Sequence, residues 1–199
     1  MLAGSASLDH DVGVTSLPKP PTKFSKRPWQ LRLVGLADWP LEAAMSQDPD
    51  VVRWTFYPSE ASEAVARDWV RTSVARAAAG DGYRYTITGP DGTVGVAGIV
   101  TVGERGHPEV FYALLAEGRG TGAATATVAC LTEWLLSQQR VGRVDLVTVA
   151  GNGASERVAA RCGYSLTGEE PGEHRGETVL LRTWSVTRLG AEPVPPAAG

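Results

Sequence analysis

Apolar and polar positions follow two different periods along the chain, which predicts strands in some segments and helices in others. Residues 83–88 and 94–102 are rich in β-branched side chains and are joined around Pro90-Asp91-Gly92, a typical hairpin signal. From Ala123 onward, apolar residues recur every three or four positions, as on one face of a helix. The same criteria predict strands at 30–36, 109–115, 144–149, 164–168 and 178–184. They predict a short helix that starts at 37–40, a longer helix from Ser59 or Ser62 to Gly80, and another at 154–162. This succession predicts an α/β fold, a sheet with helices on both faces.

The two ends of the chain lack such a pattern. Residues 1–28 carry four prolines among basic residues without sustained periodicity, so we expect a flexible extension without a core of its own, which could pack over the domain or stay mobile. Residues 189–199 include three prolines and are expected to form a disordered tail. The segment between them, 29–188, is expected to form a single domain.

Composition narrows the class of protein. The chain has 199 residues, of which 43% are hydrophobic and 21% charged, which is enough for one domain with a sizeable core. A formal net charge of −3 gives no reason to expect a nucleic acid or a membrane surface as partner. No signal peptide or membrane-spanning run is evident, so a cytoplasmic location is expected. The only cysteines, Cys130 and Cys162, fit neither a disulfide framework nor a metal site, so no metal is expected.

The most informative stretch is 109–139, where a strand, a glycine-rich turn and an amphipathic helix follow one another. Three glycines, Gly118, Gly120 and Gly122, allow a tight turn in which successive N–H groups point in one direction. A helix that starts after such a turn presents unpaired N–H groups and the positive end of its dipole. This arrangement is typical of an anion site, although the glycines could also serve only to turn the chain.

Two known phosphate motifs fit this turn less well than a third. A P-loop requires Lys-Ser/Thr after its last glycine, but Ala123-Ala124 follow here. The dinucleotide fingerprint is formally met by Gly118, Gly120 and Ala123, but the turn lies past the middle of the chain and Asp145 lies inside the next strand. The pattern Arg-x-x-Gly-x-Ala, at Arg119, Gly122 and Ala124, fits better.

At these residues the sequence resembles the GNAT acyl-CoA-dependent N-acetyltransferases, whose pyrophosphate loop has the pattern Arg/Gln-x-x-Gly-x-Gly/Ala. A second motif, NGASERVA at residues 152–159 followed by Gly163-Tyr164, is similar to a stretch of the RimJ/RimL-type branch. Leu31-Arg32-Leu33 and Asp48-Pro49-Asp50 are also similar to the opening of that branch. The resemblance spans 29–188 and implies a mixed, mostly antiparallel sheet whose strands splay apart at a cofactor cleft.

The resemblance implies acetyl-CoA as cosubstrate. Its pantetheine arm would enter between the strands that end near Leu115 and Ala150. Backbone groups of the first strand would pair with pantetheine amides, the N–H groups of the turn would hold the pyrophosphate, and Asn152 would bond the pantetheine arm. Asn152 could instead cap the helix that follows, and the Arg119 side chain could bind phosphate or be solvated. The implied cofactor-binding residues are Ala113, Leu114, Leu115, Arg119, Gly120, Thr121, Gly122, Ala123, Ala124 and Asn152.

The implied reaction is direct attack of a primary amine on the thioester, which requires a base and a proton donor. Glu109, at the start of the central strand, is the candidate base, with a solvated carboxylate as the alternative. Ser155 is the candidate donor, with a helix cap as the alternative. Relatives carry a tyrosine donor where this chain has Ala159, so Ser155, Tyr112 or water are left for that role.

The predicted function is therefore acetyl transfer from acetyl-CoA to a primary amine, on a protein N-terminus or a small molecule. Two alternatives are kept: a non-catalytic acyl-CoA-binding module, which the unusual Phe111 and Ala113 favour, and a nicotinamide-dependent oxidoreductase that uses the same glycines. A homodimer is also left open. The acidic segment 168–177 is predicted to connect the last two strands, where it would attract a cationic amine or only solubilise the surface.

Overall fold

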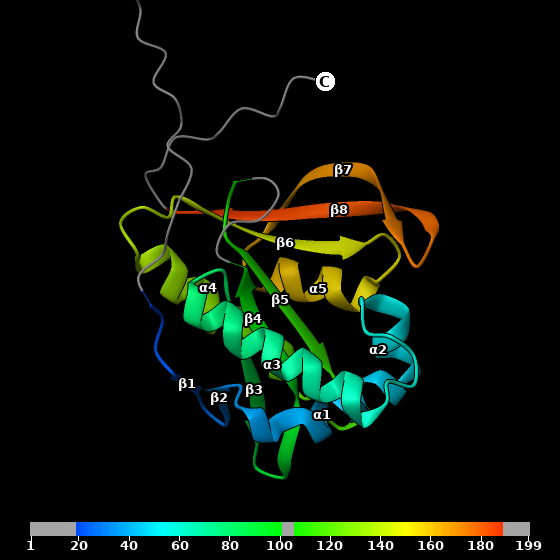
Figure 1. The fold of residues 1–199 in the computed structure, drawn as a ribbon. Helices are drawn as coiled ribbons and strands as arrows, with labels where there is room; N and C mark the ends of the chain where they lie inside the picture. Colours follow the sequence, from blue (N-terminus) through cyan, green and yellow to red (C-terminus); the bar gives the residue numbers. More distant parts are fainter. Residues whose placement is uncertain (1–18, 101–105, 189–199) are drawn as a thin grey trace, which may run out of the picture.

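The structure, a computed structural model, describes residues 19–100 and 106–188. Its centre is a single eight-stranded sheet with the order β1-β2-β3-β4-β5-β6-β8-β7, and helices lie against it (Figure 1). Every neighbouring pair of strands is antiparallel except β5 and β6. The predicted mixed α/β fold is therefore confirmed. None of the helices in the described residues has the length and apolar character needed to cross a membrane.

The strands are β1 (Lys23–Lys26), β2 (Trp29–Leu33), β3 (Gly82–Gly89), β4 (Gly92–Val100), β5 (Glu109–Leu114), β6 (Arg143–Val149), β7 (Ser165–His174) and β8 (Glu177–Thr187). The α-helices are α1 (Trp39–Gln47), α2 (Pro49–Trp54), α3 (Glu63–Ala79), α4 (Ala123–Ser137) and α5 (Gly153–Arg161). Two short 3-10 helices, η1 (Leu36–Asp38) and η2 (Ala116–Gly118), precede α1 and the glycine-rich turn.

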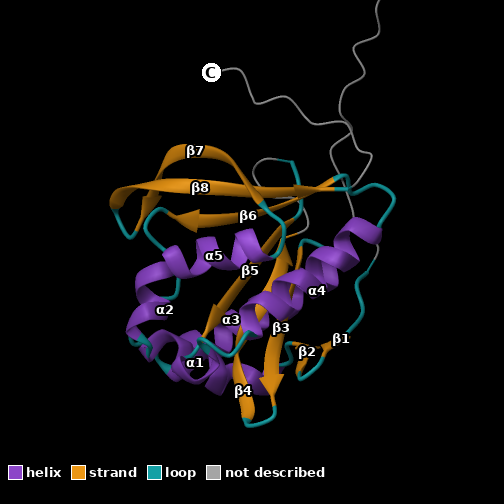
Figure 2. Ribbon diagram, turned by 180° about the vertical axis from the view of Figure 1, so that it is seen from behind, coloured by secondary structure: helices purple, strands orange, loops and turns teal. Residues whose placement is uncertain are grey.

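The helices cover the two faces of the sheet, with α1, α2 and α3 on one side and α4 and α5 on the other (Figure 2). The larger core, beneath α4 and α5, contains Val110 and Leu114 of β5 together with Leu131 and Leu135 of α4. The smaller core, beneath α1 to α3, contains Ala113 with Met45 and Tyr57. Alternate residues of β5 therefore face opposite sides of the sheet, as the period of a strand requires.

The parallel contact between β5 and β6 is short. Only Glu109 and Asp145 are paired in register, and the Asp145 N–H donates to the Pro108 carbonyl at 2.9 Å. Beyond this point the two strands separate, while β6 stays paired with β8 along its whole length. The splayed strands that the resemblance implied are therefore present, and the gap between them opens toward the glycine-rich turn that follows β5.

Three segments differ from the sequence-based prediction. Strand β1 lies inside residues 1–28, for which no strand was predicted and packing on the domain was left open; it pairs with β2, and Phe24 packs against the larger core. Helix α2 was not predicted as a helix. Strand β7 covers most of 168–177, which was predicted as a connection, because its backbone pairs with β8 up to His174↔Glu177. Residues 1–18, 101–105 and 189–199 of the predicted segments lie outside the described residues.

Candidate active site

The backbone of β5 offers hydrogen-bonding groups to the gap from every second residue. The Leu115 N–H donates to the Val94 carbonyl of β4 at 2.9 Å, whereas the Pro108 carbonyl points toward β6. Because N–H and C=O groups of successive residues point to opposite sides of a strand, Ala113 and Leu115 face β4, and Tyr112 and Leu114 face the gap. Of the three residues expected to pair with pantetheine, only Leu114 therefore faces the gap, and it offers its N–H there, because its carbonyl accepts a hydrogen bond from Arg119.

The conformation of the glycine-rich turn leaves several backbone N–H groups without an internal hydrogen bond in the described part of the chain. Gly120 and Gly122 have positive φ angles of 73° and 87°, and a Cβ at either position would meet no other atom within 4 Å. Gly118 has another role, since a Cβ there would lie 2.9 Å from Val94 Cβ of β4. Within the described residues, the N–H groups of Gly120, Thr121, Gly122 and Ala124 make no hydrogen bond. The first turn of α4 thus offers a cluster of donors at the positive end of its dipole.

The Arg119 side chain is partly exposed and is bound to two carboxylates and one carbonyl. Its guanidinium donates to Asp50 Oδ2 at 2.9 Å and to the Leu114 carbonyl at 3.1 Å, and it also pairs with Asp48. Asp48 is the N-cap of α2 and accepts from the N–H groups of Asp50 and Val51. Burial alone would raise the pKa of Asp48, but the bonds from Arg119 and from these N–H groups outweigh it, and the net pKa lies below the usual value.

The other end of α2 is held by the turn between β7 and β8. His174 Nε2 bonds the Arg53 carbonyl at 2.9 Å, and Arg175 donates to the Val52 carbonyl at 2.7 Å. Arg175 also donates to the Tyr57 carbonyl. Figure 1 shows α2 beneath this turn. Since Arg119 follows β5 and the turn follows β7, α2 links the two halves of the sheet across the open end of the gap.

A hydroxyl pair lies beside the gap on the α4 and α5 side. Tyr112 on β5 donates to Ser155 Oγ on α5 at 3.1 Å. Burial raises the pKa of the Tyr112 phenol, and the bond to Ser155 offsets only part of that rise, so the phenol keeps its proton. Asn152 caps α5, because its Oδ1 accepts from the Ser155 N–H at 3.2 Å. The capping alternative for Asn152 is therefore present in the structure, and its side-chain NH₂ group has no partner among the described residues.

Glu109 lies at the closed end of the gap, where β5 and β6 meet. By the alternation of β5, its side chain is on the α3 side of the sheet, opposite to Tyr112 and Ser155. Asp145, its register partner, is buried and bonded to Arg143 Nε and to Ser185 Oγ, each at 2.7 Å. The two residues expected to act as base and acid are therefore on opposite sides of the sheet, with the gap between them.

The contacts that join distant segments were not predicted from the sequence. The Arg119 pairing with Asp48 spans 71 positions, and Arg84 pairs with Glu42 at 2.8 Å across 42 positions. Tyr57 bonds both members of the second pair, of which Glu42 is buried and Arg84 is partly exposed. The one available signal was the Asp48-Pro49-Asp50 motif, an N-cap followed by a proline in the first turn of a helix.

No set of three or more His, Cys, Asp or Glu side chains within 19–100 and 106–188 is arranged to hold a metal ion. Cys130 and Cys162 are both partly buried free thiols.

Comparisons with known proteins agree with this geometry. The family described as acetyltransferase (GNAT) domain matches residues 30–165. The fold resembles RimL, the ribosomal L7/L12 alpha-N-protein acetyltransferase in complex with coenzyme A, with a TM-score of 0.72 and 17% identity over 84% of this chain and 96% of that one. It also resembles the microcin C7 self immunity acetyltransferase MccE in complex with acetyl-CoA and AMP, with a TM-score of 0.77 and 15% identity over 85% and 98% of the two chains.

A third similar structure is a ribosomal-protein-S5-alanine acetyltransferase from Vibrio fischeri, with a TM-score of 0.71 and 17% identity over 87% of this chain and 100% of that one. A comparison with curated protein sequences found no match. The family match covers more than half of the sequence and confirms the resemblance drawn from the two motifs. The alternative of a nicotinamide-dependent oxidoreductase is therefore set aside. The chain belongs to the GNAT family of acetyltransferases.

Proposed function

We propose that this acetyltransferase moves the acetyl group of acetyl-CoA to a primary amine by direct attack, with the thioester held in the gap between β5 and β6. The observation that carries the proposal is the single register pair between these strands, Glu109↔Asp145, beyond which the strand edge of β5 is unpaired. An extended chain with amide groups can pair with such an edge as an additional strand would. RimL with coenzyme A and MccE with acetyl-CoA support the choice of cosubstrate.

The residues present fit this cosubstrate. The N–H groups of Gly120, Thr121, Gly122 and Ala124 would hold the pyrophosphate at the N-terminus of α4, where the helix dipole favours negative charge. Ala123 begins the helix and is buried beneath this cluster. The gap-facing groups of Tyr112 and the Leu114 N–H would pair with the pantetheine amides. The Arg119 contribution is structural, because its guanidinium fixes the turn to α2.

Proton transfer is divided between the two sides of the gap. Glu109 would take the proton of the attacking amine, which at neutral pH is mostly protonated since its pKa is roughly 8 to 10. Ser155 accepts a hydrogen bond from Tyr112, so its own proton can point toward the departing thiolate. If Ser155 gives up that proton, Tyr112 can replace it. The pair would thus supply the proton that relatives take from a tyrosine at the position matching Ala159 of this chain.

The test is thioester consumption with a panel of primary amines, including short peptides with free N-termini. The proposal predicts release of the CoA thiol that depends on the amine and on its concentration. Tight acetyl-CoA binding without amine-dependent release would instead support the non-catalytic acyl-CoA-binding module. RimL and the S5-alanine acetyltransferase are named for the ribosomal proteins that they acetylate, so a protein N-terminus is one natural member of the panel.

A further inference from the structure

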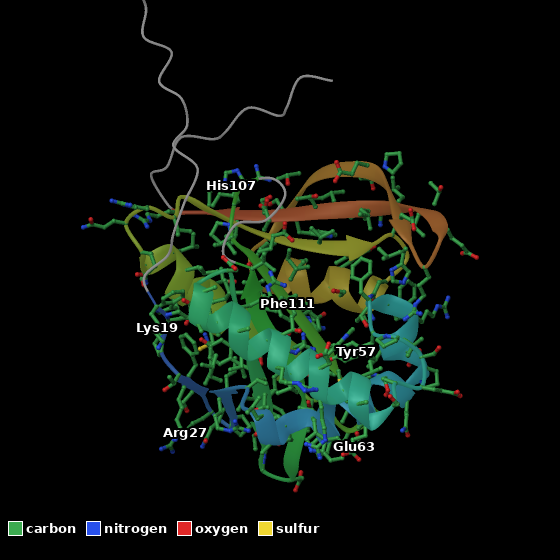
Figure 3. The ribbon with its side chains drawn as sticks, in the orientation of Figure 1. Lys19, Arg27, Tyr57, Glu63, His107 and Phe111 are labelled. Carbon is green, nitrogen blue, oxygen red and sulfur yellow. The ribbon has the colours of Figure 1, made fainter. Side chains whose placement is uncertain are left out.

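A pocket on the α3 side of the sheet, separate from the gap, has in its lining Val100, the register partner of Glu109. It is lined by Ser73 and Arg76 of α3, Gly82 and Arg84 of β3, Val100 of β4 and Phe111 of β5. Figure 3 shows Phe111 beside α3. This is the side on which Glu109 lies, so a molecule in the pocket reaches the reacting groups from the side opposite to Ser155.

The charge of this lining is positive. Arg84 is neutralised by Glu42, whose carboxylate accepts from it at 2.8 Å and 3.1 Å. Arg76, which is exposed in the last turn of α3, forms no ion pair with any carboxylate of the described residues. One guanidinium without a counter-charge, beside the Ser73 hydroxyl, matches a carboxylate, which guanidinium binds through two parallel hydrogen bonds.

Strand register fixes the distance from Arg76 to the candidate base. The Arg76 Nη2 atom lies over Gly82, 3.5 Å from the position that a Cβ would take there. Gly82 pairs with Val100, and Val100 pairs with Glu109, so the three residues form one row across β3, β4 and β5. Neighbouring strands are about 4.8 Å apart, which places Arg76 roughly 10 Å from the Glu109 backbone.

The wall between these two positions is apolar. The Phe111 ring lies against Gly98 of β4, where a Cβ would meet the ring at 2.3 Å, and the Arg84 guanidinium is 5.6 Å from the ring centroid. The row therefore offers an anion site, an apolar path along Val100 and Phe111, and a carboxylate at the closed end of the gap. An α-amino acid is too short for this row, because a single carbon joins its amine and carboxylate.

We propose that the acceptor is a primary amine that carries a carboxylate several bonds away, with the carboxylate held by Arg76 and the amine delivered to Glu109. This inference rests on the proposed function, since it names the class of its second substrate. A single unpaired guanidinium favours the monoanionic carboxylate over a phosphate ester, which carries up to two charges.

The experiment compares 6-aminohexanoate with 6-aminohexanamide, which have the same amine and the same chain length. For the wild-type enzyme we expect the KM of the acid to be at least about tenfold lower than that of the amide, a difference of about 1.4 kcal/mol in binding. Arg76→Gln should raise the KM of the acid to that of the amide and leave the KM values of the amide and of acetyl-CoA unchanged. Arg76→Lys should keep part of the preference.

The matched control is Arg71→Gln, on the same helix but outside the pocket lining. It should leave the preference intact, because it removes the same charge from the same helix at a position that does not line the pocket. Equal KM values for the acid and the amide in the wild-type enzyme, or a preference that survives Arg76→Gln, would overturn the inference.

Calorimetric titration of 6-aminohexanoate into the enzyme saturated with CoA separates this inference from the proposed function. If no amine is acetylated but 6-aminohexanoate binds in an Arg76-dependent manner, the proposed function fails and the site stands. If other amines are acetylated but 6-aminohexanoate does not bind in an Arg76-dependent manner, the inference about the acceptor fails and the proposed function stands.

Discussion

The Tyr112 hydroxyl on β5 donates a hydrogen bond of 3.1 Å to Ser155 Oγ on α5, so two hydroxyls from different elements meet beside the gap. If they pass a proton to the departing thiolate as a unit, neither acts without the other. Tyr112→Phe and Ser155→Ala should each lower kcat by roughly 10²- to 10⁴-fold, with acetyl-CoA affinity nearly unchanged. The double variant should be little slower than either single one, because residues that act as a unit are not additive.

Steady-state kinetics and calorimetry on the three variants check this. Tyr164→Phe is the control, since it removes a buried hydroxyl that bonds Thr132 instead. Losses in kcat that simply multiply in the double variant would mean that the two hydroxyls act independently.

Glu109 is expected to accept a proton from the amine on the α3 side of the gap. Glu109→Gln should lower kcat/KM for the amine most at neutral pH and least at pH values near the pKa of the amine, where the free amine needs no base. The pH profile of kcat/KM, measured beside Glu117→Gln, an exposed carboxylate in η2, is the check. A uniform loss at every pH would show that Glu109 supports the structure of the site instead of moving a proton.

The Arg119 and Asp48 pairing should stabilise the protein in a pH-dependent way. The pKa of Asp48 is lowered in the folded protein, so its contribution is present above the unfolded value of about 3.9 and is lost as pH falls through the lower folded value. Asp48→Ala should lower the free energy of unfolding at pH 7 by about 1 to 2 kcal/mol, through loss of the cap and of the ion pair. Urea unfolding at pH 7 and near pH 3 measures this.

The difference between wild type and Asp48→Ala should shrink at the acidic pH. Asp68→Ala, at an exposed site on α3, serves as the control and should change stability little at either pH. A difference for Asp48→Ala that is equal at both pH values would show that the cap alone, without its charge, carries the stabilisation.

Gly122 has a positive φ angle of 87° and an open side, so a side chain there would both strain the turn and project where the pyrophosphate is proposed to lie. Gly122→Val should weaken acetyl-CoA binding by well over tenfold, or more than about 1.4 kcal/mol. Gly163→Val imposes the same backbone strain, with a φ of 82°, at the end of α5 and away from the turn. Calorimetry should find the affinity lost only in the first variant; equal affinities would remove the turn from the cofactor site.

Local patterns predicted those parts of the structure whose conformation is set by neighbouring residues. The strand, turn and helix from Glu109 to Ser137 followed from apolar periodicity and from glycines at the turn, and they are present. The first residues of β7 were predicted as a strand, but its continuation beyond Gly168 was missed, because Pro171 and Gly172 favour a loop locally, whereas pairing with β8 makes the segment a strand.

Details of the site that depend on register or on distant partners could not be predicted. The backbone groups of Leu114 face the gap and those of Ala113 do not, because the Leu115 N–H bonds Val94 on β4. The pairing of the Arg119 guanidinium with Asp48, 71 positions away, was likewise not predicted. In both cases the deciding contact comes from a strand or helix far along the chain, which the local pattern does not contain.

The most direct test of the account is to follow the acetyl group through a single turnover. Enzyme in excess over isotopically labelled acetyl-CoA is mixed with an amine, and the masses of the intact protein and of the amine are measured over time. Direct transfer across the gap predicts that the label passes from CoA to the amine, that the protein is never acetylated, and that Ser155→Ala slows the transfer. Labelled protein that forms before labelled amine, or label that stays on CoA whatever amine is added, would contradict it.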